Sequence, residues 1–192
     1  MNAEIDISST VLKTERLTMR PWRQEDLDDL FEYARVDGVG QMAGWIPHES
    51  REKSREILNR FIDGKKTFAL EYAGKAIGSL GIELYDAERF PELESRKGRE
   101  IGYVLSKDYW GQGLMPEAVR EAIRYLFKNV GVDFITCGHF LSNSQSARVQ
   151  EKCGFRHYAY GEFHTRMGTV EPDEKNILTR EEWLKQRGKN NG

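Results

Sequence analysis

The sequence has little cysteine, no long hydrophobic run and no excess of charge of either sign. Its two cysteines, Cys137 and Cys153, have no neighbour at metal-ligand spacing, and two thiols cannot make the disulfide framework of a small secreted domain. We therefore expect no metal site and a reducing compartment, the cytoplasm. No apolar stretch approaches the roughly 20 residues that cross a bilayer, and the N-terminus lacks the basic and apolar regions of a signal peptide.

The sequence also has no large excess of positive or negative charge. Lys plus Arg number 29 and Asp plus Glu number 31, which gives a formal net charge of -2. So close a balance creates no long-range field that attracts nucleic acid or an anionic membrane. We expect neither as a partner.

What is present is enough chain for one globular core. A length of 192 residues suits a single domain, and neither an internal repeat nor a linker divides the sequence. We expect one domain over residues 1–187. Residues 188–192 are polar and glycine-rich, and we expect a disordered tail there.

The N-terminal part predicts one strand and two helices. Alternation of apolar and polar residues over 17–22 indicates a half-buried strand that Pro21 ends. Apolar residues at helical spacing indicate helices at 25–36 and 49–62, the second with Ser50 as its N-cap. The N-terminal part is therefore predicted to contain both a strand and helices.

A hairpin and a loop follow. Two strand-like runs within 67–85 are separated by Gly74 and Lys75, which predicts antiparallel neighbours. Residues 86–98 show neither period and are predicted to form a surface loop. Its length suits a lid or a substrate contact.

The C-terminal part predicts a β-α-β unit. Strands are expected at 98–106 and 132–140, with a helix whose apolar stripe covers 115–127 between them. Such a crossover joins parallel strands. A short helix at 144–155, one or two strands and a helical turn or two at 180–187 complete the chain.

The run "YWGQGLMPEAVREAI" places two glycines, Gly111 and Gly113, where a helix begins. It lacks the spacing of a P-loop, and Pro116 stands where a dinucleotide fingerprint has its third glycine. Two interpretations remain. The glycines and the free N–H groups of the helix form an anion site suited to pyrophosphate, or they simply turn the chain from strand to helix.

The run "EIGYVLSKDYWGQGLMPEAV", followed by "NSQSARVQEKCGF", resembles the GNAT N-acetyltransferases, in particular the ribosomal-protein N-terminal (RimJ/RimL-like) branch. The segments "LKTERLTMRPWRQEDLDDLFEYA" and "LTREEW" extend the resemblance over nearly the whole chain. It implies an α/β (α+β) fold with a mixed sheet of about six to seven strands, about four helices and a β-α-β core that binds acetyl-CoA.

The resemblance also implies acetyl-CoA as co-substrate and the residues that hold it. Backbone amides of the glycine loop take the pyrophosphate, the strand before the loop meets the acetyl carbonyl and pantetheine, and an asparagine after the second strand contacts coenzyme A. Mapped onto this sequence, these residues are Tyr103, Val104, Leu105, Trp110, Gly111, Gln112, Gly113, Leu114, Met115 and Asn143. Trp110 replaces a Gln or Arg of the general family pattern, and Met115 a Gly or Ala.

Catalytic candidates are few. Glu100 begins the strand that the family uses for acetyl-CoA and is our candidate base, although an exposed carboxylate at a strand end is an equal alternative. Ser146 is implied as the proton donor to the thiolate, against simple helix capping by Ser146 and Asn143. His139 is a second candidate base or a structural histidine. Gly102 marks a predicted bulge or close backbone approach.

The predicted function is direct transfer of acetyl from acetyl-CoA to a primary amine, either a protein N-terminus or a small molecule. The alternative is a catalytically silent acyl-CoA-binding or sensor module. The sequence does not choose the acceptor, and a homodimer stays open because relatives often dimerise. Aromatic residues either line the acceptor pocket or fill the core, namely Trp22, Trp45, Tyr72, Tyr85 and Phe90. Cys153 is interpreted as a small buried hydrophobe.

Overall fold

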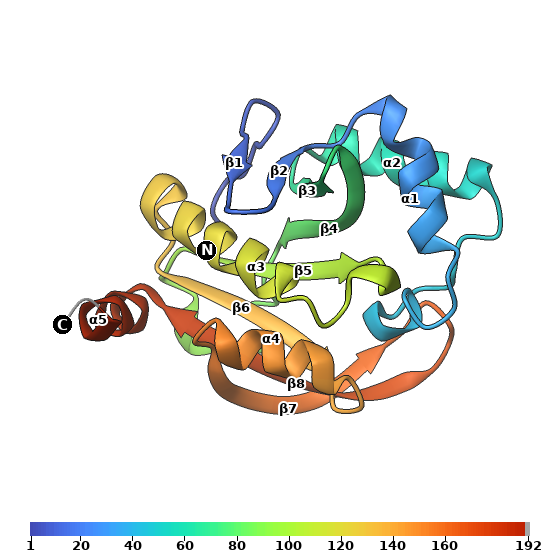
Figure 1. The fold of residues 1–192 in the computed structure, drawn as a ribbon. Coiled ribbons are helices and arrows are strands. Elements are labelled where there is room, and N and C mark those ends of the chain that lie inside the picture. The colour runs from blue at the N-terminus through green and yellow to red at the C-terminus, as the bar shows by residue number, and fades with distance from the viewer. Residues whose placement is uncertain (191–192) are drawn as a thin grey trace.

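The computed structural model describes residues 1–190, which form one eight-stranded sheet with helices on both faces (Figure 1). The strands are β1 (Leu12–Lys13), β2 (Thr18–Pro21), β3 (Thr67–Tyr72), β4 (Lys75–Glu83), β5 (Gly98–Leu105), β6 (Phe134–Phe140), β7 (Arg156–His164) and β8 (Val170–Thr179). The α-helices are α1 (Leu27–Ala34), α2 (Arg51–Gly64), α3 (Leu114–Tyr125), α4 (Ser144–Lys152) and α5 (Arg180–Asn190). The sheet has more strands than predicted, partly because β1 is too short to show alternation.

The sheet is mixed, as predicted. Its strand order is β1-β2-β3-β4-β5-β6-β8-β7, and every neighbouring pair is antiparallel except β5 and β6. The parallel pair is joined through α3, which confirms the predicted β-α-β unit. Ser50 caps α2 by accepting the N–H of Lys53, also as predicted.

The parallel pair opens into a split. Partners along β5 and β6 run from Gly98 opposite Phe134 to Ile101 opposite Cys137, and the pairing stops there. Beyond these residues the two strands diverge toward their C-terminal ends (Figure 1). Ligands of α/β sheets commonly bind at the carboxyl ends of parallel strands, so a ligand site is expected in this opening.

Strand alternation assigns side chains to the two faces of the sheet. Ile101, Leu105 and Cys137 pack with α3 in one hydrophobic core, and we call this side the α3 face. Val104 packs on the second core with Leu30 and neighbouring residues of α1 and α2, and we call that side the α1 face. The split therefore has two differently built sides.

The hairpin between β3 and β4 is confirmed, but its turn lies one residue earlier than predicted. Lys75 already belongs to β4 and pairs with Tyr72. The turn residues are Ala73 and Gly74, with φ of 49° and 83°. A two-residue turn with positive φ at both positions matches the twist of the flanking strands.

Residues 86–97 form an irregular and mostly exposed segment, as the sequence predicts, but buried apolar side chains anchor it. Phe90 is fully buried and packs against Tyr85 and Tyr158, and a short 3-10 turn, Pro91–Leu93, follows it. None of residues 86–97 lines the cavity described below, so the lid prediction is not supported. The apolar side chains hold this segment on the sheet.

The C-terminal helix is longer than predicted. Trp183 of α5 stacks on Phe127 at 5.3 Å between ring centroids, which fixes the helix to the core. Residues 188–190, predicted to be disordered, continue α5. Residues 191–192 of the predicted tail lie outside the described residues. Within 1–190, no helix is both long and apolar enough to cross a membrane.

Candidate functional site

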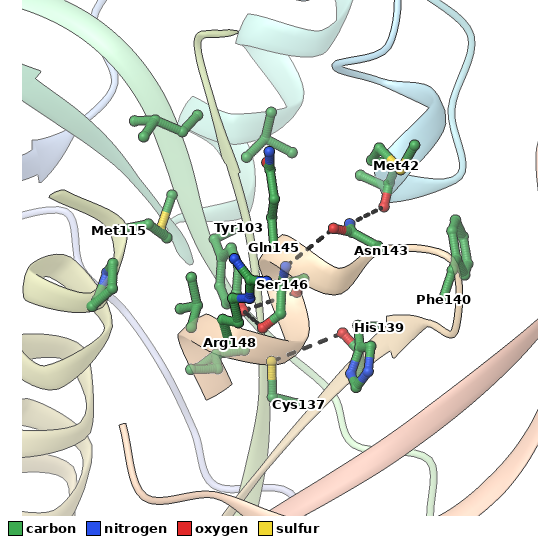
Figure 2. A pocket seen from close by; sticks show the side chains of 18 of the residues that line it. Met42, Tyr103, Met115, Cys137, His139, Phe140, Asn143, Gln145, Ser146 and Arg148 are labelled. Atoms are coloured by element: carbon green, nitrogen blue, oxygen red, sulfur yellow. Dashed lines mark hydrogen bonds between the residues drawn. The ribbon is translucent and has the colours of Figure 1, made fainter. Parts of the chain in front are cut away.

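The split between β5 and β6 opens into a cavity of about 500 Å³ (Figure 2). Its walls come from β5, the glycine loop, the start of α3, the end of β6 and the start of α4. Eleven of the twelve predicted site residues line it: Glu100, Tyr103, Val104, Leu105, Trp110, Gly111, Gly113, Leu114, Met115, Asn143 and Ser146. The structure thus gathers most of the sequence candidates into one place.

The glycine loop has a backbone that only glycine adopts easily. Gly111 and Gly113 have φ of 74° and 77°, and Gly113 is the N-cap of α3. A Cβ atom on Gly111 would meet nothing within 4 Å, so the space beside it is open to a ligand. Free N–H groups at the start of a twelve-residue helix make this an anion-binding geometry.

A distant turn holds the glycine loop in place. Arg16 donates from Nη1 to the carbonyl oxygen of Gln112 at 2.9 Å and forms a salt bridge with Glu117 at 2.7 Å. Gln112 does not line the cavity, because its own side chain donates back to the carbonyl of Asp108. The sequence carries no signal for the Arg16–Glu117 pair, whose members lie 101 residues apart.

Trp110 joins the loop to the end of β5. Its indole Nε1–H donates to the carbonyl oxygen of Leu105 at 2.8 Å, and its ring packs against both hydrophobic cores. Lys107 Nζ lies 5.9 Å from the ring centroid. In this chain the tryptophan therefore fixes where the loop starts. Leu114 and Met115 are buried below it.

On the α3 face, a hydroxyl pair lies beside the cavity. The Tyr103 hydroxyl is 3.0 Å from Ser146 Oγ (Figure 2). Ser146 Oγ also accepts from Gln150 Nε2 at 3.3 Å. Burial raises the pKa of Tyr103 well above its ordinary value, so the phenol keeps its proton at neutral pH. The sequence assigned Tyr103 a backbone role alone and missed this side chain.

Helix capping belongs to Asn143 and not to Ser146. Asn143 Oδ1 accepts the N–H of Ser146 at 3.1 Å, and Asn143 Nδ2 donates to the carbonyl of Met42 at 3.3 Å. The Ser146 hydroxyl faces Tyr103 instead of a backbone group. The capping interpretation is thus confirmed for Asn143 and wrong for Ser146.

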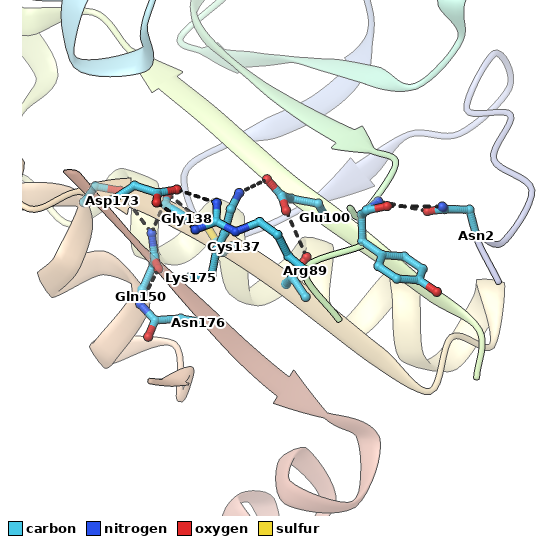
Figure 3. Close-up of polar contacts among 12 residues, drawn as sticks. Asn2, Arg89, Glu100, Cys137, Gly138, Gln150, Asp173, Lys175 and Asn176 are labelled. Carbon is cyan, nitrogen blue, oxygen red and sulfur yellow. Dashed lines mark hydrogen bonds and ion pairs between the residues drawn. The ribbon is translucent and has the colours of Figure 1, made fainter. Parts of the chain in front are cut away.

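On the α1 face, Glu100 is not the free carboxylate of the alternative interpretation. Its Oε1 accepts from Lys175 Nζ at 2.7 Å and its Oε2 from Thr136 Oγ1 at 3.1 Å (Figure 3). Lys175 reaches Glu100 across β6 because residue 138 is glycine. A Cβ atom on Gly138 would lie 2.9 Å from Lys175 Nζ.

A second ion pair continues this polar row. Arg89 binds both carboxylate oxygens of Asp173, at 2.9 and 2.8 Å (Figure 3). Gly161 makes room for it, since a Cβ atom there would lie 1.9 Å from the guanidinium. Asp173 and Lys175 both line the cavity. Sequence reasoning missed this row because its members come from separate segments.

His139 lies on the α3 face, where one ring nitrogen has a long contact to a carboxylate and the other has no hydrogen-bond partner among the described residues. Its Nε2 is 3.5 Å from Glu174 Oε2, and its Nδ1 is buried without a hydrogen-bond partner in the described part of the chain. Glu174 also contacts His157 Nδ1 at 2.8 Å. His139 lines the cavity, which is unlike a fully bonded structural histidine.

Gly102 does not mark a bulge. The β4–β5 register runs unbroken from Gly78 opposite Leu105 to Glu83 opposite Glu100. A Cβ atom on Gly102 would meet nothing within 4 Å, because the residue faces the cavity. The bulge prediction is therefore wrong. Because Gly102 has no side chain, it leaves open space in the cavity.

The aromatic residues proposed from the sequence fill cores instead of the cavity. None of the five lines it, and Trp22, Tyr85 and Phe90 are buried. Phe140 and Phe163 line it instead. Among the remaining candidates, burial raises the pKa of the Cys153 thiol to about 11, which agrees with its predicted role as a buried hydrophobe. Within residues 1–190, no three His, Cys, Asp or Glu side chains are grouped to hold a metal ion.

Comparison with known proteins adds an independent finding. Residues 16–156 match the sequence model of the acetyltransferase (GNAT) domain. The chain is 27% identical over 153 residues to the uncharacterized N-acetyltransferase p20 of Bacillus licheniformis, an alignment that covers 76% of this chain and 82% of that protein.

Two solved structures share the fold. The microcin C7 self-immunity acetyltransferase MccE, in complex with acetyl-CoA and AMP, superposes with a TM-score of 0.74 at 13% identity, covering 92% of this chain and 99% of its own. The ribosomal-protein-S5-alanine acetyltransferase of Vibrio fischeri superposes with a TM-score of 0.69 at 20% identity, covering 91% and 99%. Both likenesses extend along almost the whole described chain.

Proposed function

Because the chain belongs to the GNAT acetyltransferase family, we propose that it transfers the acetyl group of acetyl-CoA directly to a primary amine. The observation that carries the proposal is the split cavity with a glycine-shaped anion site at its mouth, Gly111 and Gly113 at the N-terminus of α3. The proposed acceptor is a small molecule or a protein N-terminus, which are the kinds of acceptor suggested by the relatives named above.

The residues around the cavity fit acetyl-CoA. Backbone N–H groups of the glycine loop would take the pyrophosphate, since Gly111 leaves open space beside it. The β5 segment from Gly102 to Leu105 is not paired with β6 and would receive the pantetheine arm. Arg148 and Lys152 of α4 also line the cavity and would add positive charge that attracts the phosphates of acetyl-CoA.

Acetyl-CoA supplies an activated acetyl group as a thioester. In the proposed reaction, the amine nitrogen forms a bond to the acetyl carbon as the carbon–sulfur bond breaks. An acceptor that arrives as an ammonium ion gives the amide, the free thiol of coenzyme A and one released proton. The chain must therefore remove protons from the amine and return one to the sulfur.

The proton-handling groups lie on opposite faces of the split. Glu100, on the α1 face, is our candidate base for the amine, and its bonds to Lys175 and Thr136 fix the carboxylate in position. Tyr103 and Ser146, on the α3 face, are our candidates for returning a proton to sulfur, because their hydroxyls form one hydrogen-bonded pair. His139 is the alternative base.

Two measurements test the proposal. Acetyl-CoA should raise the Tm, because a ligand that binds only the folded state stabilises it. Thiol release should then appear with at least one primary amine in a panel of peptides and small amines. Stabilisation without release on any acceptor would favour the alternative, a catalytically silent acyl-CoA-binding or sensor module. Absence of stabilisation would remove the cofactor assignment.

A further inference from the structure

The α1-face half of the cavity carries no acidic group that is free to bind an additional ammonium. Among the residues that line the cavity, the acids are Glu100 and Asp173. Each already has a cation of this chain at hydrogen-bond distance, Lys175 for Glu100 and Arg89 for Asp173. The Asp173 side chain is only 3% exposed, so its carboxylate is largely closed to solvent, whereas the Arg89 side chain is 24% exposed.

The same half is bounded by an apolar wall. By strand alternation, Phe140 lies on the same face as Gly138, and it contacts Phe163 at 5.6 Å between ring centroids. Val39, Met42 and Ala43 complete the wall from the segment between α1 and α2. Phe163 and Met42 keep 39% and 43% of their surface exposed, so both offer apolar area to a ligand.

This wall is fixed before any acceptor arrives. Gly44, with φ of 80°, lies so close to Phe163 that a Cβ atom would be 2.9 Å from the ring. Its carbonyl accepts the N–H of Arg166 at 2.9 Å. The carbonyl of Met42 accepts from Asn143 at the start of α4. Three separate segments therefore hold the wall together.

From this combination we propose that the acceptor is a primary monoamine with an apolar group next to its amino group. The inference rests on the proposed function and names its substrate class. An apolar substituent gains free energy by covering the wall. A second ammonium in the same space would lose its hydration with no acid left to pair with it, which disfavours polyamines and other polycations.

The experiment compares acceptors that differ in their apolar group and in their number of ammonium groups. Thiol release from acetyl-CoA is measured with phenethylamine, ethylamine, spermidine and a short peptide that begins with phenylalanine. We expect phenethylamine or the peptide to exceed spermidine at least tenfold in kcat/KM, since pocket contacts of this size discriminate by about tenfold or more. Comparing the peptide with phenethylamine shows whether the enzyme prefers a protein N-terminus or a free amine that carries the same apolar group.

Two variants and a control locate the effect. Phe163→Ala should lower kcat/KM for the preferred apolar amine about tenfold, lower it much less for ethylamine, whose apolar group is small, and leave the acetyl-CoA Tm shift unchanged. Tyr160→Ala is the matched control, because Tyr160 is an aromatic residue of the same strand that is 68% exposed and does not line the cavity. Arg89→Gln should raise the use of spermidine relative to phenethylamine by releasing Asp173 from its pair.

The outcomes distinguish this inference from the proposed function. Spermidine turnover equal to or above that of phenethylamine, or equal effects of the two aromatic substitutions, overturns the substrate class while transfer stands. Calorimetric titration of phenethylamine into the protein with coenzyme A provides a readout without turnover. Binding there that Phe163→Ala weakens, with no thiol release on any amine, supports the apolar site and overturns the transferase.

Discussion

The two faces of the split cavity are assembled from different kinds of chain. The α3 face uses one continuous stretch, from β5 through the glycine loop and α3 to α4, and much of it acts through backbone groups. The α1 face joins side chains from distant positions, such as Met42, Phe163 and Lys175. Backbone groups of the α3 face suit a ligand that a whole family shares, because they do not depend on side-chain identity. Side chains of the α1 face suit an acceptor that varies within a family, because side chains can change without disturbing the backbone.

The largest expected effect belongs to the α1 face. Glu100→Gln should lower kcat by about 100-fold, the scale of a lost general base, and leave the Tm shift by acetyl-CoA unchanged. Glu83→Gln is the control, since Glu83 is the cross-strand neighbour of Glu100 but does not line the cavity. Steady-state kinetics of Glu100→Gln and His139→Gln decide which is the base. An unchanged rate removes Glu100 from the mechanism.

The next effect belongs to the α3 face and acts on binding. Gly111→Val should weaken acetyl-CoA binding about tenfold, because a left-handed backbone costs an L residue about 1–2 kcal/mol and the side chain enters the ligand space. Gly74→Val is matched to it: its φ is 83° and its Cβ would also meet nothing within 4 Å. Calorimetry on both variants separates loop strain from ligand contact, and equal affinities contradict the anion site.

A smaller effect tests whether Asn143 is more than a cap. Asn143→Ala removes the bond to the Ser146 N–H and should cost about 1 kcal/mol, which is a fall in Tm of about 2–4 °C for a chain of this size. Asn143→Ser keeps a capping oxygen and should recover most of that Tm. If acetyl-CoA affinity recovers fully as well, the asparagine amide makes no contact of its own.

The smallest effect concerns the two buried cysteines, which belong to the hydrophobic core on the α3 face. Cys153 has its pKa raised to about 11 by burial, and burial also raises the pKa of Cys137, so little thiolate exists at neutral pH in the folded protein. Iodoacetamide should therefore modify neither thiol within hours, measured by mass spectrometry, and both should react in denaturant. The reaction should become faster as pH rises toward 11. Rapid modification at pH 7 would show that the α3-face core opens readily.

Prediction from sequence succeeded where a local pattern determines a local geometry. The glycine turn at the start of α3, the Ser50 cap and the parallel β5–β6 pair follow from short-range rules. It failed where the outcome depended on a distant partner. Phe90 is buried against other segments, and nothing near it in the sequence shows that.

The candidate site divides in the same way. Every residue predicted to hold acetyl-CoA lines the cavity except Gln112, whose side chain turns back to Asp108, whereas Arg148 of α4 lines it without having been predicted. For the α1 face the sequence supplied Glu100 but neither its cation nor the glycine that lets that cation reach it. Lys175 and Gly138 are joined to Glu100 only by strand pairing across β6.

The sequence by itself determined the family, the glycine loop and the strand–helix–strand unit, because these depend on backbone conformations that neighbouring residues set. Tertiary structure alone decided that Arg16 holds the loop, that Tyr103 faces Ser146 and that the two acids lining the cavity, Glu100 and Asp173, are already paired. Those contacts join residues 43 to 96 positions apart, and their geometry exists only after the sheet has brought the segments together.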